Sequence, residues 1–347
     1  MVTNLIGRIL IVGQGAMGLR HLAMARKLFP KAQIKILAKN QTSELIKLSD
    51  GYLEKDELQY FAPQVAVIAS PAPFHIEMAL KLARAGIHLL IEKPLSSSTE
   101  RVVELIELAR ENKLTLMTGY NLRFSSSLMH FKELIEKRIL GKVLSVRCEV
   151  GQYLPDWRAN KDYRTTVSAN YHLGGGVLLE LSHEIDYLRW IFGELDWVNA
   201  TLTKQSDLEI DVEDSAHLTL GFEANSAGHQ IVANLNLDFI RHDRTRSCTA
   251  ICETGTIKWD GTDGSVKIYD PKTNSWKEVV KNGSDIEETL MREWENFIDS
   301  VTNVKDPLVT GLDGLRVLEI VEAARESATE GSRVKVIKAY PVIDLKP

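Results

Sequence analysis

The sequence predicts an α/β domain with a doubly wound parallel sheet, followed by an α+β domain with a largely antiparallel, open-faced sheet. Residues 1–120 alternate continuous apolar runs with stretches of helical spacing, the pattern of a parallel sheet covered on both faces. Residues 121–347 instead contain runs in which apolar and polar residues alternate, as in an antiparallel sheet with one wet face. We therefore expect a domain boundary near residue 120.

The composition fits a globular protein that acts on small molecules. The chain has 347 residues, 44% of them apolar, enough for a large core and two ordinary domains. Because 42 Lys and Arg stand against 47 Asp and Glu, the net charge of -5 does not favour nucleic acid or an anionic membrane as partner. Residues 5–12 are too short to span a membrane and no cleavage pattern follows, so we expect a cytoplasmic protein. Three cysteines without CxxC spacing predict neither disulfides nor a metal site.

The first domain is predicted as repeated strand and helix units. "RILIV" is the first strand, and apolar residues recur at helical spacing after the glycines that follow it. A helix from about His75 ends at Gly86, the residue type expected just beyond a helix C-terminus. Ser97 and Glu100 predict a capping box ahead of a helix over 102–109. The remaining strands are predicted at "QIKILAKN", "QVAVIAS", "IHLLIEKP" and "LTLMTGY".

The second domain has a different pattern. A helix is predicted over 128–140, and strict alternation in "VLSVRCEV" and "GHQIVANLNLDF" predicts two strands of the open-faced sheet. Asp-Gly turns in "TIKWDGTDGSVKIYD" continue the sheet. One helix is predicted between Gly176 and Gly193, and helices over 287–301 and 312–327 follow the last strands.

The turn "GQGAMG" has the G-x-G-x-x-G spacing, directly after a strand and at the start of a helix. Gly13 would permit the tight turn, Gly15 would let the backbone approach a pyrophosphate, and Gly18 would allow the helix to pack closely on the strand. The helix N-terminus would offer free N–H groups to phosphate oxygens. The turn therefore predicts a dinucleotide-binding (Rossmann) domain whose cofactor contacts also include Gln14, Ala16 and Met17.

The choice of cofactor depends on the end of the second strand, where NAD sites usually carry an acidic residue. The sequence there is "ILAKN", so Lys39 and Asn40 occupy the position, with Arg20 on the preceding helix. A carboxylate would repel a 2′-phosphate, whereas a cation would pair with it. The cofactor is therefore predicted as NAD(P), with NADP favoured over NAD.

The strand "IHLLIEKP" ends in two opposite charges and a proline. Ligands of open α/β sheets bind beyond the carboxyl ends of the strands, where Glu92 and Lys93 lie. Pro94 cannot continue the ladder and keeps Lys93 extended, which would direct its ammonium into the crevice. Glu92 could pair with Lys93 or anchor it.

A second polar group lies on the helix predicted between Gly176 and Gly193. On a 3.6-residue period Glu180, His183, Asp186 and Tyr187 fall within about 60° of one another, apart from the apolar stripe. Imidazole titrates near neutral pH, and a neighbouring carboxylate could fix its tautomer. His183 is therefore a candidate for proton exchange with an alcohol.

Together these pieces resemble the glucose-fructose oxidoreductase, inositol dehydrogenase and rhizopine catabolism protein family, called Gfo/Idh/MocA. The resemblance covers nearly the whole chain, and the combination of glycine turn, Glu-Lys-Pro and His-x-x-Asp is more specific than any one piece. The matching segments are "GQGAMG" at 13–18, "SPAPFH" at 70–75, "AGIHLLIEKPLS" at 85–96, "HEID" at 183–186 and "GLDGLRVLEIVEAARES" at 311–327.

The resemblance implies a nicotinamide-dependent oxidoreductase of sugars, polyols or related alcohols. It implies that Lys93 touches substrate and nicotinamide ribose, that His183 exchanges the substrate proton, and that the Lys93-Pro94 bond is cis. Many members have an aspartate four residues before the histidine; here Leu179 stands there, and Glu180 could replace it geometrically. The segments "GYNLRF", "YLPDWR" and "DYR" are similar to members of bacterial surface-sugar biosynthesis. Further cofactor contacts are implied for Ser70, Pro71, His75 and Glu92.

Substrate contacts are expected from both domains. Asn121 and Arg123 follow the last strand of the first domain, beside the expected substrate. The segment "YLPDWRANKDYR" combines aromatic rings, on which sugars stack, with guanidinium groups that bind phosphate or carboxylate in a fork. A sugar nucleotide or acidic sugar is therefore a plausible substrate. The predicted contacts in this segment are Trp157, Arg158, Tyr163 and Arg164.

The expected function is hydride transfer between NAD(P) and a secondary alcohol or carbonyl of a sugar derivative. His183 is assigned as the base, with Asp186 or Glu180 to orient it, and Lys93 would stabilise alkoxide charge or act as acid/base itself. Two alternatives stay open: a nucleotide-dependent sensor or scaffold without chemistry, and transient oxidation that permits sugar elimination or hydrolysis. The open-faced sheet and the family resemblance predict a homodimer or homotetramer.

Overall fold

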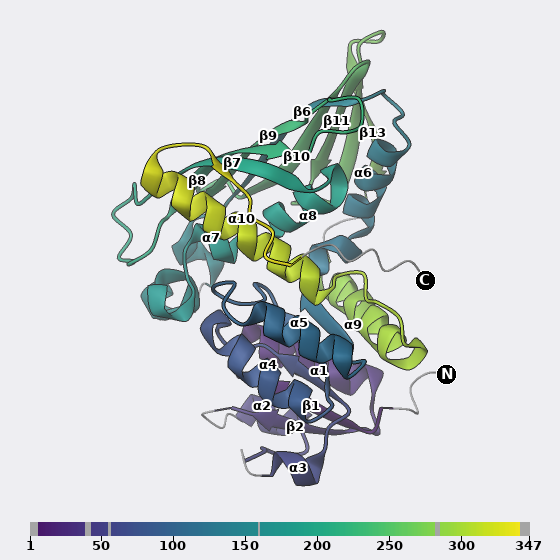
Figure 1. Ribbon diagram of the computed structural model, residues 1–347, viewed down its shortest axis with the longest axis vertical. Helices are drawn as coiled ribbons and strands as arrows, with labels where there is room; N and C mark the ends of the chain where they lie inside the picture. The colour runs from purple at the N-terminus through teal and green to yellow at the C-terminus, as the bar shows by residue number, and fades with distance from the viewer. Residues whose placement is uncertain (1–5, 39–42, 55–56, 159, 282–284, 341–347) are drawn as a thin grey trace. The chain divides into compact units, whose positions relative to one another are not determined.

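The chain forms two compact units in the computed structural model, which describes residues 6–38, 43–54, 57–158, 160–281 and 285–340 (Figure 1). Unit 1 comprises Met1–Asn121 with Glu287–Leu318, and unit 2 comprises Leu122–Ile286 with Glu319–Pro347. Among the described residues, none of the helices combines the length and apolarity needed to cross a bilayer.

Unit 1 contains a five-stranded parallel sheet in the order β2-β1-β3-β4-β5. The chain order reverses between β1 and β3, and open α/β sheets bind ligands beyond the carboxyl ends of strands at such a point. The strands β1, β3, β4 and β5 are almost entirely buried, which explains their continuous apolar sequences. The strands are β1 (Arg8–Val12), β2 (Gln33–Leu37), β3 (Val65–Ile68), β4 (His88–Glu92) and β5 (Leu116–Gly119).

The helices predicted after the glycine turn, from about His75 and over 102–109 are present in unit 1, with one correction, while α2 and α3 were not predicted. Helix α5 begins at Val102. Its N-cap residue is therefore Arg101, which has φ of 58°. The predicted capping box of Ser97 and Glu100 is therefore wrong, because Ser97 lies too far before the helix. The elements are α1 (Ala16–Leu28), α2 (Ser43–Leu48), α3 (Leu58–Phe61), η1 (Ala72–Phe74), α4 (His75–Arg84), α5 (Val102–Glu111) and η2 (Asn121–Phe124), which extends into unit 2.

A late segment of the chain also belongs to unit 1. It includes α9 (Ile286–Asn303), apart from its first residue, and the start of α10 (Gly311–Glu330). The indole of Trp294 packs with its ring centroid 6.1 Å from that of His21 and 6.3 Å from that of Phe29. The sequence analysis placed this segment in the second domain, because no local pattern shows which core its apolar face covers.

Unit 2 contains a nine-stranded sheet in the order β13-β12-β11-β10-β6-β9-β8-β7-β14. The pair β6 and β9 is parallel, and the other pairs are antiparallel. The strands are β6 (Val143–Gly151), β7 (Leu195–Thr203), β8 (Ser215–Phe222), β9 (Val232–Asp238), β10 (Thr245–Cys252), β11 (Gly255–Asp260), β12 (Ser265–Asp270), β13 (Ser275–Lys281) and β14 (Val334–Lys335). This arrangement confirms the predicted fold class.

The helices α6, α7 and α8 pack on this sheet (Figure 1). In β9 the buried Ala233, Leu235 and Leu237 alternate with more exposed residues, so one face is core and the other is wetter. The helices of unit 2 are α6 (Ser126–Glu136), α7 (Val177–Glu180) and α8 (His183–Phe192), with short 3₁₀ turns η3 (Leu154–Trp157), η4 (Tyr163–Thr165), η5 (Val167–Ala169) and η6 (Tyr171–Leu173).

The single helix predicted between Gly176 and Gly193 is wrong. The helix is interrupted at Leu181 and Ser182, so α7 and α8 are separate. Ser182 precedes α8 with helical dihedrals (φ −68°, ψ −8°), and its side chain makes no capping hydrogen bond. Angles based on one continuous helix therefore do not describe how the polar residues of this segment are directed.

Candidate functional site

The glycine turn leaves an open surface at the N-terminus of α1. Gly13 has φ of 118°, and a Cβ there would lie 2.4 Å from the Ala69 carbonyl oxygen. A Cβ on Gly18 would lie 2.6 Å from the Gly13 carbonyl oxygen, so α1 can pack on the turn only with glycine at 18. A Cβ on Gly15 would meet nothing within 4 Å. The fold thus requires Gly13 and Gly18, whereas the space at Gly15 is available to a ligand.

A buried hydroxyl lies beside this turn. Ser70 follows β3, and a Cβ on Gly13 would lie 2.9 Å from its backbone nitrogen. The Ser70 hydroxyl is buried and has no hydrogen-bond partner among the described residues. Buried polar groups are normally satisfied, so this oxygen, the open Gly15 and the free N–H groups of α1 fit the phosphates and ribose of a dinucleotide. Of the residues expected to select the cofactor, Arg20 is exposed on α1, while Lys39 and Asn40 lie outside the described residues.

The Glu-Lys-Pro segment is anchored through Glu92 at the end of β4. One carboxylate oxygen of Glu92 lies 2.7 Å from Nε2 of His21, and the other accepts a hydrogen bond of 3.1 Å from the Lys93 backbone N–H. Glu92 is 6% exposed. The Lys93-Pro94 peptide is cis, as the resemblance implied. Glu92 therefore anchors the backbone of Lys93 within unit 1 and is not a solvated strand terminus.

His75 holds the same segment from the other side. Its Nε2 lies 2.6 Å from the Ser70 carbonyl oxygen, and its Nδ1 lies 3.1 Å from the Pro94 carbonyl oxygen. Burial lowers the pKa of His75, and the Ser70 carbonyl opposes that shift. The ring was expected among the cofactor contacts. Both of its nitrogens face backbone carbonyls, so it connects the end of β3 with the residue after Lys93.

Asn121, an expected substrate contact, is also largely buried in unit 1. Its amide donates a 2.9 Å hydrogen bond to the hydroxyl of Thr289 on α9. The side chain therefore joins the end of the sheet to the late segment of the chain.

In unit 2 His183 is the first residue of α8 and is partly exposed. The two carboxylates expected to orient it have other partners. Glu180 accepts a 3.0 Å hydrogen bond from the Ser168 hydroxyl. Asp186 accepts hydrogen bonds of 2.9 and 2.6 Å from the guanidinium of Arg123. Tyr187, expected on the same polar face, has its hydroxyl 3.0 Å from the buried Cys148 thiol.

A small pocket of about 10 Å³ lies in unit 2 within the segment expected to bind substrate. The Trp157 indole donates to the Gln152 carbonyl at 2.9 Å and packs edge-on against Phe239, which fixes its ring. Arg158 and Lys161 are exposed, and no ion pair joins either to another described residue. Lys161 was not predicted as a substrate contact, although it lies in the same segment, "YLPDWRANKDYR". The lining residues are Leu154, Trp157, Arg158, Lys161, Tyr163, Thr166 and Ser168.

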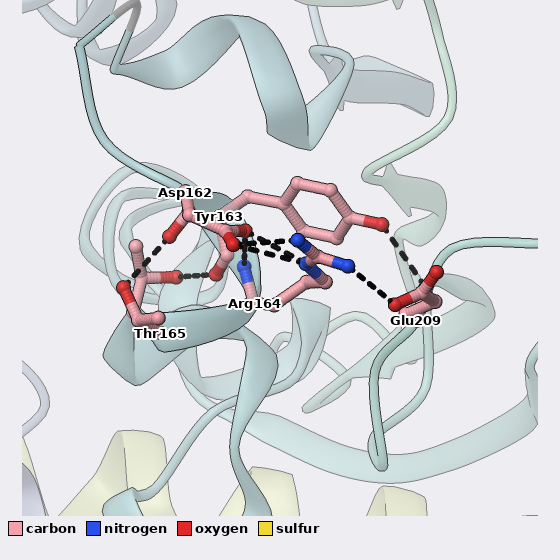
Figure 2. A network of polar contacts seen from close by, with 6 residues as sticks. Asp162, Tyr163, Arg164, Thr165 and Glu209 are labelled. Atoms are coloured by element: carbon pink, nitrogen blue, oxygen red, sulfur yellow. Dashed lines mark hydrogen bonds and ion pairs between the residues drawn. The ribbon is translucent and has the colours of Figure 1, made fainter.

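Arg164, the other cation expected to bind substrate, is already paired (Figure 2). Its guanidinium donates to both carboxylate oxygens of Asp162, at 2.8 to 3.0 Å, and to Glu209 at 2.8 Å. These partners raise the pKa of Arg164 further. The Tyr163 hydroxyl accepts from the Glu209 backbone N–H at 3.1 Å and so fixes the ring beside the pocket. Arg164 therefore stabilises the loop, and Arg158 with Lys161 carry the charge that lines the pocket.

Two family models match the chain. Residues 7–120 match the NAD-binding Rossmann fold of the GFO_IDH_MocA oxidoreductase family, and residues 132–336 match its C-terminal alpha/beta domain. The chain belongs to this family. The predicted family, fold class and enzyme class are thereby confirmed: the protein is an oxidoreductase with an NAD-binding fold.

Several relatives of this Gfo/Idh/MocA chain are named as dehydrogenases. Levoglucosan dehydrogenase of Pseudarthrobacter phenanthrenivorans is 33% identical over 143 residues, which are 40% of this chain and 35% of that protein. Myo-inositol 2-dehydrogenase of Thermotoga maritima is 25% identical over 344 residues, 95% of this chain and 98% of the relative. The scyllo-inositol 2-dehydrogenase (NADP(+)) IolW of Bacillus subtilis is 24% identical over 78% of each chain.

Solved structures share the fold of this family member. Levoglucosan dehydrogenase in complex with NADH superposes with a TM-score of 0.82 at 21% identity, over 96% of this chain and 99% of that one. The WlbA dehydrogenase from Bordetella pertussis in complex with NADH and UDP-GlcNAcA gives 0.77 at 20% identity, with the same coverage. Both units therefore have the fold of known dehydrogenases.

Proposed function

We propose that the protein is an NAD(P)-dependent dehydrogenase that transfers a hydride to or from a secondary alcohol or carbonyl of a sugar, polyol or sugar derivative. One observation carries the proposal furthest: Lys93 follows a strand end that is fixed on both sides by buried histidines, in the same unit as the open glycine turn. A lysine that only solvated a strand end would need no such anchoring. The names of the relatives that align over most of the chain support the same reaction class.

The protein's own groups hold and move protons. The cofactor, when bound at the glycine turn and Ser70, supplies the hydride acceptor or donor. Lys93 stabilises negative charge on the reacting oxygen by electrostatics. His183 exchanges the hydroxyl proton; at the first position of α8 the helix dipole opposes positive charge, which favours a neutral ring able to accept a proton. Glu180 acts on the site through its hydrogen bond with Ser168. Asp186 holds the start of α8, and so His183, in position through its bonds with Arg123.

The cofactor is proposed to be NADP in preference to NAD. The support is the absence of a carboxylate in "ILAKN", together with the exposed Arg20 on α1. One relative is named for NADP(+), whereas the structural neighbours above were solved with NADH. The ratio of kcat/KM for the two cofactors tests the preference, and a Lys39→Glu variant should shift it towards NAD. A wild type that prefers NAD would overturn it.

The substrate is proposed to carry an anionic group, as a sugar nucleotide or acidic sugar does. Arg158 and Lys161 line one pocket with the fixed rings of Trp157 and Tyr163, and guanidinium and ammonium groups bind carboxylate or phosphate while sugars stack on the rings. A sugar of bacterial surface polysaccharides would satisfy this chemistry. The structural neighbour that holds UDP-GlcNAcA binds such a compound.

A substrate screen tests the proposed reaction. Neutral polyols, uronates and sugar nucleotides are offered with NAD and NADP, and reduction or oxidation of the nicotinamide is followed by absorbance. Lys93→Ala and His183→Ala should each lower kcat by roughly 10²- to 10⁴-fold. The matched controls are Lys277→Ala and His217→Ala, which replace exposed residues of β13 and β8. Turnover that is undiminished in both site variants would refute the assignment.

We also propose that the protein works in the cytoplasm as a homodimer or homotetramer. The wetter face of the unit 2 sheet supports this, because the residues of β9 that alternate with the buried Ala233, Leu235 and Leu237 are more exposed in the single chain. Sedimentation that shows only monomer at micromolar concentration would contradict it.

A further inference from the structure

We propose that His21 and Trp294 are positioning residues, which hold Glu92 so that the backbone of Lys93 is fixed in one orientation. The inference deepens the proposed function and rests on it for the role of Lys93. Four groups form a continuous chain of hydrogen bonds within unit 1. The Trp294 indole N–H donates to Nδ1 of His21 at 3.0 Å, Nε2 of His21 lies 2.7 Å from Glu92, and Glu92 accepts from the Lys93 N–H at 3.1 Å.

The indole decides the tautomer of His21. The nitrogen of Trp294 can only donate, so Nδ1 of His21 must present a lone pair and the ring hydrogen is on Nε2. Nε2 therefore donates a hydrogen bond to Glu92, whose carboxylate is the acceptor. A second proton on His21 would have to be placed on Nδ1, where it would break the bond from Trp294. The indole thus fixes the tautomer and the orientation of the ring.

Burial makes the arrangement rigid and hard to replace. His21 and Trp294 are 0% exposed, so water cannot take the place of either partner. A buried polar group that loses its partner has given up its bonds to water without gaining a replacement. Removing one member of these hydrogen-bonded residues is therefore unfavourable. The two residues come from α1 and α9, and the bond that they form fixes α9 to the strand end that carries Lys93.

Glu293, the neighbour of Trp294, belongs to the same group. It is 0% exposed, and neither of its carboxylate oxygens has a hydrogen-bond partner among the described residues. Burial, and then the charge of Glu92, raise the pKa of Glu293 well above its ordinary range. The other titratable groups near Glu92 are His21, Lys93 and His75.

Three substitutions separate positioning from packing. Trp294→Phe removes the N–H and keeps most of the ring, so His21 becomes able to take a second proton or to change tautomer. His21→Leu removes both bonds. His21→Gln can replace both, since its amide N–H₂ donates towards Glu92 and its carbonyl accepts from Trp294, and it cannot be protonated. Trp276→Phe and His217→Gln, at exposed positions of unit 2, are the matched controls.

The experiment combines nitrogen-15 NMR of the histidine rings with kcat and KM over pH 5.5 to 9. We expect wild-type His21 to carry its proton on Nε2 over the whole range. Trp294→Phe and His21→Leu should lower kcat by roughly 10- to 100-fold with little change in the KM for cofactor, because Lys93 is misplaced and the glycine turn is untouched. In Trp294→Phe the loss should deepen as pH falls. His21→Gln should restore most of kcat.

The outcomes separate this inference from the proposed reaction. If the wild type turns over no substrate, the proposed function fails, and the ring spectra alone decide the inference. A wild-type His21 protonated on Nδ1 would overturn it. So would pH profiles of Trp294→Phe that superimpose on those of the wild type and of Trp276→Phe. A loss of kcat in Trp294→Phe that is equal at every pH, with the wild-type tautomer retained, would show a packing effect and would also overturn it.

Discussion

Arg123 binds Asp186 through two hydrogen bonds inside unit 2, of 2.9 Å from Nε and 2.6 Å from Nη2. Their side chains are 3% and 1% exposed, so the pair is removed from water. Arg123 lies in η2, and Asp186 lies in the first turn of α8, three residues after His183. The pair therefore fixes the start of α8 relative to the segment that follows the Rossmann sheet. Arg123 was expected as a substrate contact and Asp186 as an orienter of His183; in this structure the two side chains bind each other.

Removing Asp186 should destabilise the protein strongly. Asp186→Ala leaves a buried guanidinium without its carboxylate, which typically lowers the free energy of unfolding by about 3–5 kcal/mol. Urea denaturation measures the change. The matched control is Asp162→Ala, whose carboxylate also binds an arginine in two places but at the surface, where water replaces it. Equal destabilisation by the two variants would contradict the interpretation of a buried structural pair.

Glu293 should make the stability of the protein fall as pH rises. Its folded-state pKa is raised, first by burial and then by Glu92, so the folded state keeps a proton that the unfolded chain releases. Above the ordinary range of a carboxyl group, stability then falls by about 1.4 kcal/mol per pH unit until the folded pKa is reached. Glu293→Gln has no such proton to lose. The variant should gain on the wild type as the pH rises above the ordinary range of a carboxyl group.

Urea denaturation of both proteins at several pH values tests this expectation. Glu295→Gln is the control, because it lies on the same helix and is exposed. A difference between Glu293→Gln and the wild type that stays constant with pH would rule out a titrating buried carboxyl.

The glycines of the turn should respond differently to alanine. Gly15 has φ of −75° and open space, so Gly15→Ala should fold normally and weaken cofactor binding by filling the phosphate surface. Gly18→Ala would place a methyl group 2.6 Å from a backbone carbonyl and should lower the melting temperature. Thermal unfolding and fluorescence titration with NADH and NADPH measure the two effects. Unchanged cofactor affinity in Gly15→Ala would remove the support for this binding surface.

Much of the fold could be predicted because it depends on local patterns. Continuous apolar strands, the glycine spacing and the alternation in β9 each need only a short segment of sequence. The break between α7 and α8 could not, since Leu181 and Ser182 also fit a continuous helix. The predicted grouping of Glu180 and Asp186 with His183 was based on one continuous helix, which the structure does not have.

The candidate site was harder to predict, because its side chains depend on partners far away in sequence. The sequence pattern drew attention to Glu92 at the strand end, but its partner His21 lies 71 residues away in the chain. Trp294 lies 273 residues from His21, and no spacing rule connects them. In the loop around Trp157, residue types suggested four contacts equally. The structure distinguishes the two arginines: Arg164 forms ion pairs with Asp162 and Glu209, whereas Arg158 lines the pocket.

Arg158 and Arg164 should therefore differ in their effect on an anionic substrate. Arg158→Ala removes a cation from the pocket and should raise the KM for a uronate or sugar nucleotide by roughly tenfold, with kcat changed little, because charge-assisted hydrogen bonds contribute about 1.5–3 kcal/mol. Arg164→Ala should leave that KM nearly unchanged and loosen the loop, since its guanidinium is held by Asp162 and Glu209 (Figure 2). Steady-state kinetics with matched charged and neutral sugars measure both. If the two variants raise KM equally for both kinds of sugar, the pocket does not select for charge.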